Sequence, residues 1–228
     1  IKELRLTPDQ IQDRIGRIIT EFNRLIDLYA EPEYREKWKV SFASNSVAMG
    51  SAKDRWGFNA EIAKEKNVRF SDVVDAYNKG AVDELKDRAP LHEAILNMAV
   101  ESMPPPHVAQ RYRIPRIWKG DVNSEVGQAM LNCDDNGPVV MAITNIVVDP
   151  QAGVVASGRL FSGTITEGST FHLLGARVDQ RVQQVCLFMG PYREIVGTIN
   201  AGNIPALLGL DSAKAGETLS MITDIAPF

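Results

Sequence analysis

The N-terminal half of the chain carries apolar side chains at the spacing of amphipathic helices. After the stretch Thr7-Pro8-Asp9-Gln10, apolar residues recur every three or four positions among polar ones: Ile11, Ile15, Ile18, Ile19, Phe22, Leu25, Ile26 and Tyr29. Thr7 can cap a helix, Pro8 suits the first helical position, and Gln10 completes a capping box. The pattern predicts a long helix that ends before Pro32 and packs its apolar stripe on a core.

Two further helices are predicted from their boundaries. Ser71 can cap a helix over residues 72–78, and Gly80 is placed to terminate it. Pro90 opens the other helix, whose apolar stripe consists of Leu91, Ala94, Ile95, Met98 and Ala99.

The segments between these helices give weaker signals. Residues 82–88 form a charged helix in which Glu84 and Arg88 are spaced for an ion pair one turn apart. Residues 46–49 are an apolar run that stops at a glycine, which is typical of a buried strand in a parallel sheet. Residues 33–45 show no periodicity, so we expect an irregular connection there.

The pattern changes after the three consecutive prolines at residues 104–106. Such a run favours an extended, stiff spacer, and we place a domain boundary there, between residues 1–104 and 105–228. Beyond it lie β-branched runs that are broken by glycine at the spacing of a small antiparallel barrel, most clearly in residues 158–165, 201–204 and 215–219. The expected fold is therefore an α/β part, mostly helical, followed by an all-β antiparallel barrel.

Composition and charge exclude some classes of function. Of the 228 residues, 44% are hydrophobic and 24% are charged, as in an ordinary globular protein, and the net charge is −4. An acidic balance does not predict unspecific binding to nucleic acid, so any contact with RNA must come from a local patch. No apolar run approaches the ~20 residues of a membrane span, and no signal peptide opens the sequence. We expect a cytoplasmic protein without a membrane partner.

One short motif suggests a nucleotide base site. Gly50, Ser51, Ala52 and Lys53 follow the predicted strand. In GTP-binding proteins a loop of this type turns backbone N–H groups onto the guanine O6, whereas adenine presents a donor at that position. An ordinary strand-to-loop turn is the structural alternative. The position of the motif, between a long helix and a barrel, favours the guanine site.

The remaining parts of a nucleotide site are missing from the sequence. There is no Gly-x-x-x-x-Gly-Lys-Ser/Thr for phosphates and magnesium, and no Asn-Lys-x-Asp for guanine, since Asn78-Lys79 is followed by Gly80-Ala81. The three histidines lack the spacing of metal ligands, and the two cysteines read as reduced thiols. We predict no catalytic residue and no metal site in this chain.

Basic residues are the candidates for an RNA contact. Residues 111–119 interleave rings with four basic side chains: Arg111, Arg113, Arg116 and Lys119. Such a segment suits contact with phosphates and bases, but it also suits a linker whose rings pack between domains. On the predicted barrel, Arg159 lies in a glycine-flanked strand that a partner could approach closely, and Arg181 is a second candidate beside Arg177 and Arg193.

Longer motifs carry a family resemblance. They are the stretches Tyr112 to Asp121, Met130 to Asp134, Met189-Gly190-Pro191-Tyr192-Arg193, and Ala201-Gly202-Asn203-Ile204. Together they resemble the elongation factor G and 2 family of translational GTPases, in its archaeal branch, over essentially the whole chain.

The resemblance implies a function for a longer parent protein. Such a parent binds GTP or GDP with magnesium and hydrolyses GTP on the ribosome to drive translocation of tRNA and mRNA. By this resemblance, residues 1–104 are the C-terminal part of the GTP-binding domain, and the barrel leans on small-subunit rRNA. Only Gly50, Ser51, Ala52 and Lys53 match the nucleotide site, so this piece alone is expected to be inactive and to hold no nucleotide.

Two alternatives remain open at this stage. The chain could derive from another ribosomal GTPase, such as an initiation or release factor. It could also be a stand-alone barrel module that binds RNA or protein, although a sequence that begins at Ile1 favours a piece of a longer protein.

Overall fold

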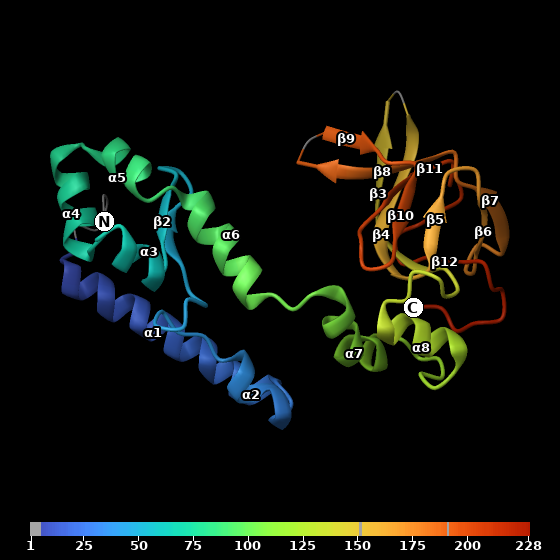
Figure 1. The fold of residues 1–228 in the computed structure, drawn as a ribbon, viewed down its shortest axis with the longest axis horizontal. Coiled ribbons are helices and arrows are strands. Elements are labelled where there is room, and N and C mark those ends of the chain that lie inside the picture. The colour runs from blue at the N-terminus through green and yellow to red at the C-terminus, as the bar shows by residue number, and fades with distance from the viewer. Residues whose placement is uncertain (1–5, 151, 191) are drawn as a thin grey trace. The chain divides into compact units, whose positions relative to one another are not determined.

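A computed structural model describes residues 6–150, 152–190 and 192–228, which divide into two compact units, Ile1–Met103 and Pro104–Phe228 (Figure 1). The division lies one residue from the expected boundary. Ile1, at the start of the sequence, and Pro191, in one of the family motifs, lie outside the described residues. Among the described helices, none combines the length and the apolar content that a membrane span requires.

The first unit is helical apart from one hairpin of two short strands. The hairpin consists of β1 (Met49–Ser51) and β2 (Trp56–Phe58), paired antiparallel. The helices are α1 (Pro8–Tyr29), α2 (Pro32–Trp38), α3 (Ala60–Glu65), α4 (Phe70–Lys79), α5 (Val82–Arg88) and α6 (Leu91–Ser102).

Helix α1 begins as predicted but packs differently. The capping box is confirmed, since the Thr7 side chain accepts from the Gln10 N–H while the Gln10 side chain accepts from the Thr7 N–H. The predicted burial is wrong, because no residue of α1 is buried and Ile18 is 62% exposed. Among the described elements, α1 packs mainly against α2 and α4, which are too few to cover its stripe.

Three local predictions in this unit are corrected. Residues 32–38 form a helix, α2, because Pro32 opens a new helix as well as ending the previous one. Helix α4 is capped from Arg69 instead of Ser71, since the Asp72 carboxylate accepts from the Arg69 N–H at 3.1 Å. Arg88 pairs with the same Asp72, at 3.2 Å, and not with Glu84.

Other predictions in this unit are confirmed. Gly80 terminates α4 with a φ of 70°, in the left-handed region. Helix α5 spans residues 82–88 as expected.

Strand β2 is the centre of the first unit's core. All three of its residues are buried, and Trp56 and Phe58 pack with a cluster of apolar residues from α3 to α6: Ile62, Val68, Val73, Leu85, Ala89 and Ala94. The helices therefore cover β2, while the turn that joins the two strands of the hairpin has exposed residues.

The second unit begins with two helices, which corrects the prediction of an all-β domain. They are α7 (Pro106–Ile117) and α8 (Glu125–Asn132). Helix α7 was missed because it has no apolar stripe and contains Pro115. Helix α8 did carry a signal, because Ser124 caps it by accepting from the Gly127 N–H at 3.1 Å.

A large antiparallel sheet forms the rest of the second unit. Its eight strands are ordered β7-β6-β12-β3-β4-β11-β8-β9, and β5 pairs separately with β10. The strands are β3 (Val140–Asp149), β4 (Gly153–Ser162), β5 (Thr164–Thr166), β6 (Thr170–Leu173), β7 (Val178–Arg181), β8 (Gln184–Met189), β9 (Tyr192–Ile195), β10 (Thr198–Asn200), β11 (Ala206–Leu208) and β12 (Thr218–Ser220).

The sheet is curved (Figure 1), and its strands contribute most of the largest apolar cluster of the second unit. Fully buried residues from six strands meet there: Met141, Ile143, Leu160, Ile165, Leu173, Leu207 and Leu219. One of the three predicted strands is corrected, since residues 201–204 lie in the turn region after β10. Gly202 there has a φ of 82°, so this glycine serves a turn and not a strand.

Gly158 shows why one strand needs a glycine at its centre. It lies opposite Ile143 on β3, next to an irregularity in the register between Ile143 and Asn145. A Cβ at this position would lie 1.9 Å from the Ala142 carbonyl oxygen, so a larger residue would force β3 and β4 apart.

Candidate functional site

The predicted guanine loop lies at the turn of the β1–β2 hairpin. Gly50 and Ser51 end β1, and Ala52 and Lys53 begin the turn that leads to β2. The prediction of a strand in a parallel sheet is wrong. Strand β1 pairs antiparallel with β2, because a turn this short can join only antiparallel strands. Arg55 completes the turn with a φ of 60°.

Gly50 is required by close packing. A Cβ on Gly50 would lie 2.5 Å from the Trp56 carbonyl oxygen and 2.9 Å from the Leu91 Cδ1. Helix α6 therefore packs directly on the hairpin, and its first residue holds the base of the turn in place.

A polar network fixes the shape of the turn. The Ser51 hydroxyl donates to the Asp54 Oδ2 at 3.0 Å and accepts from the Asp54 N–H at 3.2 Å. Tyr77 on α4 donates to the same carboxylate oxygen, and the Trp56 Nε1 donates to the Tyr77 hydroxyl at 3.1 Å. Burial, followed by the hydrogen bond to Asp54, raises the pKa of Tyr77 above its ordinary value.

The network leaves two backbone donors available. Ala52 and Lys53 are exposed, and no acceptor among the described residues binds the backbone N–H of either one. The Ser51 hydroxyl thus stabilises the turn, while the next two residues are exposed and keep backbone N–H groups that could bind a ligand. Tyr77 could not be predicted as part of this turn, because it lies far along the chain and reaches the turn only through the packing of α4.

Most of the basic segment 111–119 belongs to helix α7, which ends at Ile117. Ile114 is fully buried and Trp118 is 5% exposed, and both pack with Val126, Met130 and Phe161 inside the second unit. The Trp118 Nε1 donates to the Ala226 carbonyl oxygen at 2.7 Å. Ile114 and the Trp118 ring therefore anchor α7 within its own unit, while all four basic residues stay exposed: Arg111, Arg113, Arg116 and Lys119.

The arginines of the sheet fall into two groups. Arg181 braces a turn by donating to the Gly168 carbonyl oxygen at 2.9 Å, and Arg193 forms an ion pair with Asp149 at 3.4 Å. Arg159 is half-buried and forms neither a hydrogen bond nor an ion pair with the described residues. Burial lowers the pKa of Arg159, and the charge of Arg113 lowers it further while Cys133 opposes this. The structure thus brings Arg113 and Arg159 together and leaves Arg181 in a structural role.

Comparison with known proteins gives two kinds of match. The family model for elongation factor Tu domain 2 matches residues 153–220, which are most of the sheet. Elongation factor 2 from Cenarchaeum symbiosum is 55% identical over 228 residues, which are 100% of this chain and 31% of that protein. The chain belongs to the elongation factor 2 family.

Other archaeal elongation factor 2 proteins are similar to the chain to a comparable degree. Elongation factor 2 from Staphylothermus marinus is 55% identical over 96% of the chain, and that from Pyrobaculum arsenaticum is 50% identical over 100%. The chain spans about a third of the length of these elongation factor 2 relatives, 30% and 31% respectively.

Proposed function

We propose that the chain joins the C-terminal part of the GTP-binding domain of an elongation factor 2 to its second domain. The complete protein would bind and hydrolyse GTP on the ribosome and drive the translocation of tRNA and mRNA in the cytoplasm. The observation that carries this proposal is the 55% identity to elongation factor 2 across all 228 residues. A match of that length and identity covers both units, so it supports the order of domains as well as the family.

The first unit would contribute to the recognition of guanine. The exposed N–H groups of Ala52 and Lys53 suit the O6 acceptor of that base, and Gly50 and Ser51 hold the turn that presents them. The network of Ser51, Asp54 and Tyr77 orders this turn in advance, which lowers the entropic cost of binding.

Phosphates and magnesium do not fit the residues of this chain. The sequence has neither the glycine-rich phosphate loop with its Lys-Ser/Thr nor an Asn-Lys-x-Asp motif. Those parts of the site, and the hydrolysis itself, would belong to the remaining two thirds of the protein. We therefore propose that residues 1–228 alone neither hydrolyse GTP nor bind GDP tightly.

The second unit would be the part that meets the ribosome. Its sheet matches the second domain of elongation factor Tu, its helix α7 carries three exposed arginines, and exposed Lys119 follows the helix. In this proposal, small-subunit rRNA is its partner, and tRNA and mRNA are affected only through the whole protein.

A pair of variants at the turn tests the guanine contact in the longer protein. Ala52→Pro removes the backbone N–H, and Ala52→Gly keeps it. We expect Ala52→Pro to weaken GDP binding about tenfold, because one hydrogen bond to the base is lost, and Ala52→Gly to have little effect. Calorimetry with GDP measures both, and equal affinities for the two variants would contradict the proposed contact.

The parent activity is tested through the source gene. If the coding sequence before Ile1 supplies a phosphate loop and an Asn-Lys-x-Asp motif in frame, the complete protein should hydrolyse GTP only when ribosomes are added. Independence from ribosomes, or the absence of those motifs, would favour the stand-alone module instead.

A further inference from the structure

Helix α7 is strongly basic within an acidic protein. Residues 102–120 contain no aspartate or glutamate, although the whole chain has 29 acidic and 25 basic residues. The four exposed cations of the segment are Arg111, Arg113, Arg116 and Lys119. A local excess of this kind attracts anions at short range, whatever the net charge of the protein.

The packing of α7 brings this charge to the sheet. The Gln110 side chain is buried and donates to the Phe161 carbonyl oxygen on β4 at 2.9 Å. Arg113 follows Gln110 by one helical turn, and Arg159 precedes Phe161 by two residues, on the same face of β4. Both arginines therefore lie beside one contact between helix and strand.

Arg159 lacks the partner that a half-buried charge needs. Its strand neighbour on β3 is Ala142, and on the other side the Asn203 carbonyl oxygen is occupied by the Leu160 N–H. No carboxylate among the described residues pairs with Arg159 or with Arg113. Two like charges, one of them partly removed from water, are unfavourable together, and an anion between them would relieve the cost.

The arrangement of the basic residues favours a phosphate backbone over a single carboxylate. A guanidinium offers a planar pair of N–H donors that matches phosphate and carboxylate oxygens alike, but the further exposed cations Arg111 and Lys119 can reach neighbouring phosphates of the same strand. A single carboxylate from another protein segment would satisfy one arginine and would not reach the other exposed cations, Arg111 and Lys119.

We infer that Arg113 and Arg159 together bind one phosphodiester of RNA, and that Arg111 and Lys119 extend this contact along the backbone. This inference rests on the proposed ribosomal function, and it places the RNA contact of the second unit at α7 and β4. Arg181, a candidate from sequence, has no part in it because it braces a turn.

The test measures the binding of this chain to a short fluorescein-labelled RNA hairpin by fluorescence anisotropy. The variants are Arg113→Gln, Arg159→Gln and Arg159→Lys, and Lys214→Gln is the control because it removes one exposed positive charge elsewhere in the unit. Arg113 is exposed, so its variant stays informative if Arg159→Gln disturbs the fold, which circular dichroism will show.

We expect Arg113→Gln and Arg159→Gln each to weaken RNA binding about tenfold and to reduce the salt dependence by about one phosphate. Arg159→Lys should recover part of the loss, since it keeps the charge without the paired donors. Lys214→Gln should change the affinity less than twofold.

Two further probes identify the source of the anion. Inorganic phosphate at constant ionic strength should compete only weakly, because it offers one group where RNA offers several. An oligoglutamate peptide should bind less tightly than the RNA. The inference is overturned if oligoglutamate binds more tightly through Arg159, if free phosphate binds as well as RNA, or if both glutamine variants bind RNA as the wild type does.

Failure of this site can be separated from failure of the proposed function. If the longer protein hydrolyses GTP with ribosomes but the two arginines do not affect RNA binding, the function stands and the site falls. If RNA binding depends on both arginines but no ribosome-dependent hydrolysis is found, the site stands and the function falls.

Discussion

Helices α1 and α7 show how differently the two units use their sequence. Helix α1 has a long apolar stripe and a complete capping box, yet none of its residues is buried. Helix α7 has no such stripe and contains a proline, yet Gln110 and Ile114 are buried in it. The stripe predicts that a segment is helical, but burial depends on whether other elements are present to cover it.

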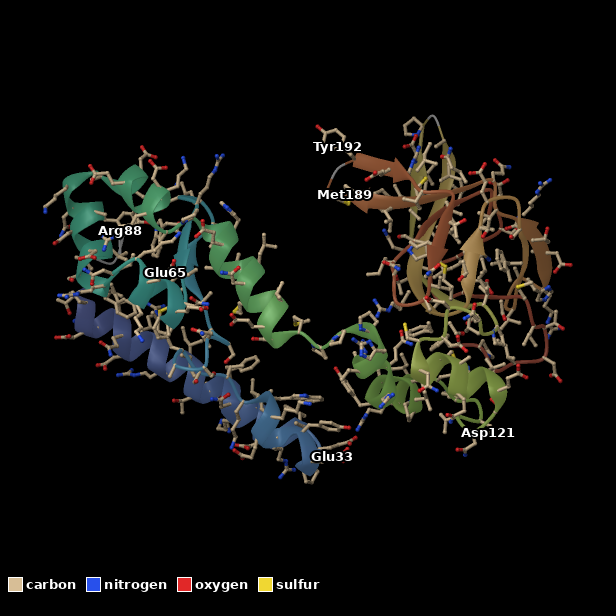
Figure 2. The ribbon with its side chains drawn as sticks, in the orientation of Figure 1. Glu33, Glu65, Arg88, Asp121, Met189 and Tyr192 are labelled. Carbon is tan, nitrogen blue, oxygen red and sulfur yellow. The ribbon has the colours of Figure 1, made fainter. Side chains whose placement is uncertain are left out.

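Apolar residues of the second unit also divide into exposed and buried ones. At the free end of the β8–β9 hairpin, Met189 is 59% and Tyr192 is 77% exposed (Figure 2). Leu160 on β4, by contrast, is fully buried in the core of the sheet. Substitutions at covered and uncovered positions should therefore have very different costs, and they provide a direct test of the comparison.

The largest effect is expected at Leu160. Leu160→Ala removes a fully buried side chain from the core of the sheet and leaves a cavity, so the free energy of unfolding should fall by about 2 to 5 kcal/mol. Urea unfolding measures it, followed by the fluorescence of Trp118 in a background in which Trp38 and Trp56 are replaced by phenylalanine. A loss below about 1 kcal/mol would mean that the core is loosely packed.

Much of this fold could be predicted from local signals. The capping box at Thr7, the stop at Gly80 and the helix over residues 82–88 depend only on neighbouring residues, and each is confirmed. The cap of α4 was misplaced because both Ser71 and Asp72 are capping residue types. The Asp72 carboxylate, at the third helical position, accepts from the Arg69 N–H, so the helix begins before Ser71.

The candidate sites depended on contacts distant in sequence, and these could not be predicted. Tyr77 joins the turn at Ser51 only because α4 folds over the hairpin. Likewise, the proximity of Arg113 to Arg159 follows from the packing of α7 on β4. The motif at Gly50 could be found from sequence, but the residues that shape it could not.

A smaller effect is expected at Trp118, which anchors α7. Trp118→Phe loses the hydrogen bond to the Ala226 carbonyl and part of a buried ring, so stability should fall by about 1 to 3 kcal/mol. Far-UV circular dichroism during urea unfolding measures the change. An unchanged midpoint would mean that α7 is held by Ile114 alone.

Tyr77 gives a pH-dependent prediction for the first unit. Because the pKa of Tyr77 is raised in the folded state, its contribution is fully present below the ordinary value of 10.0 and is lost as the pH rises through the folded pKa. Thermal unfolding should therefore show a fall in stability above about pH 10. Tyr77→Phe should lower stability by about 1 kcal/mol at neutral pH and flatten this fall. A fall of the same size in the variant would assign it to other groups.

The capping box of α1 should make a modest contribution to the free energy of unfolding. Thr7→Ala leaves the Gln10 N–H without its side-chain acceptor, so the free energy of unfolding should decrease by about 1 kcal/mol. Thr7→Ser keeps the acceptor and serves as the control. Hydrogen exchange of the first turn of α1 is the most direct measurement, and equal protection in both variants would show that the cap contributes nothing.

The smallest effect is expected on the uncovered stripe itself. Ile18 is 62% exposed, so Ile18→Ala removes little buried surface and should change the stability of the chain by less than about 0.5 kcal/mol. Exposed apolar patches also promote association, and Ile18→Lys should therefore reduce any self-association seen by sedimentation velocity without unfolding α1. A loss of about 2 kcal/mol in Ile18→Ala would instead mean that the stripe is covered in solution, and sedimentation would then show whether a second copy of the chain covers it.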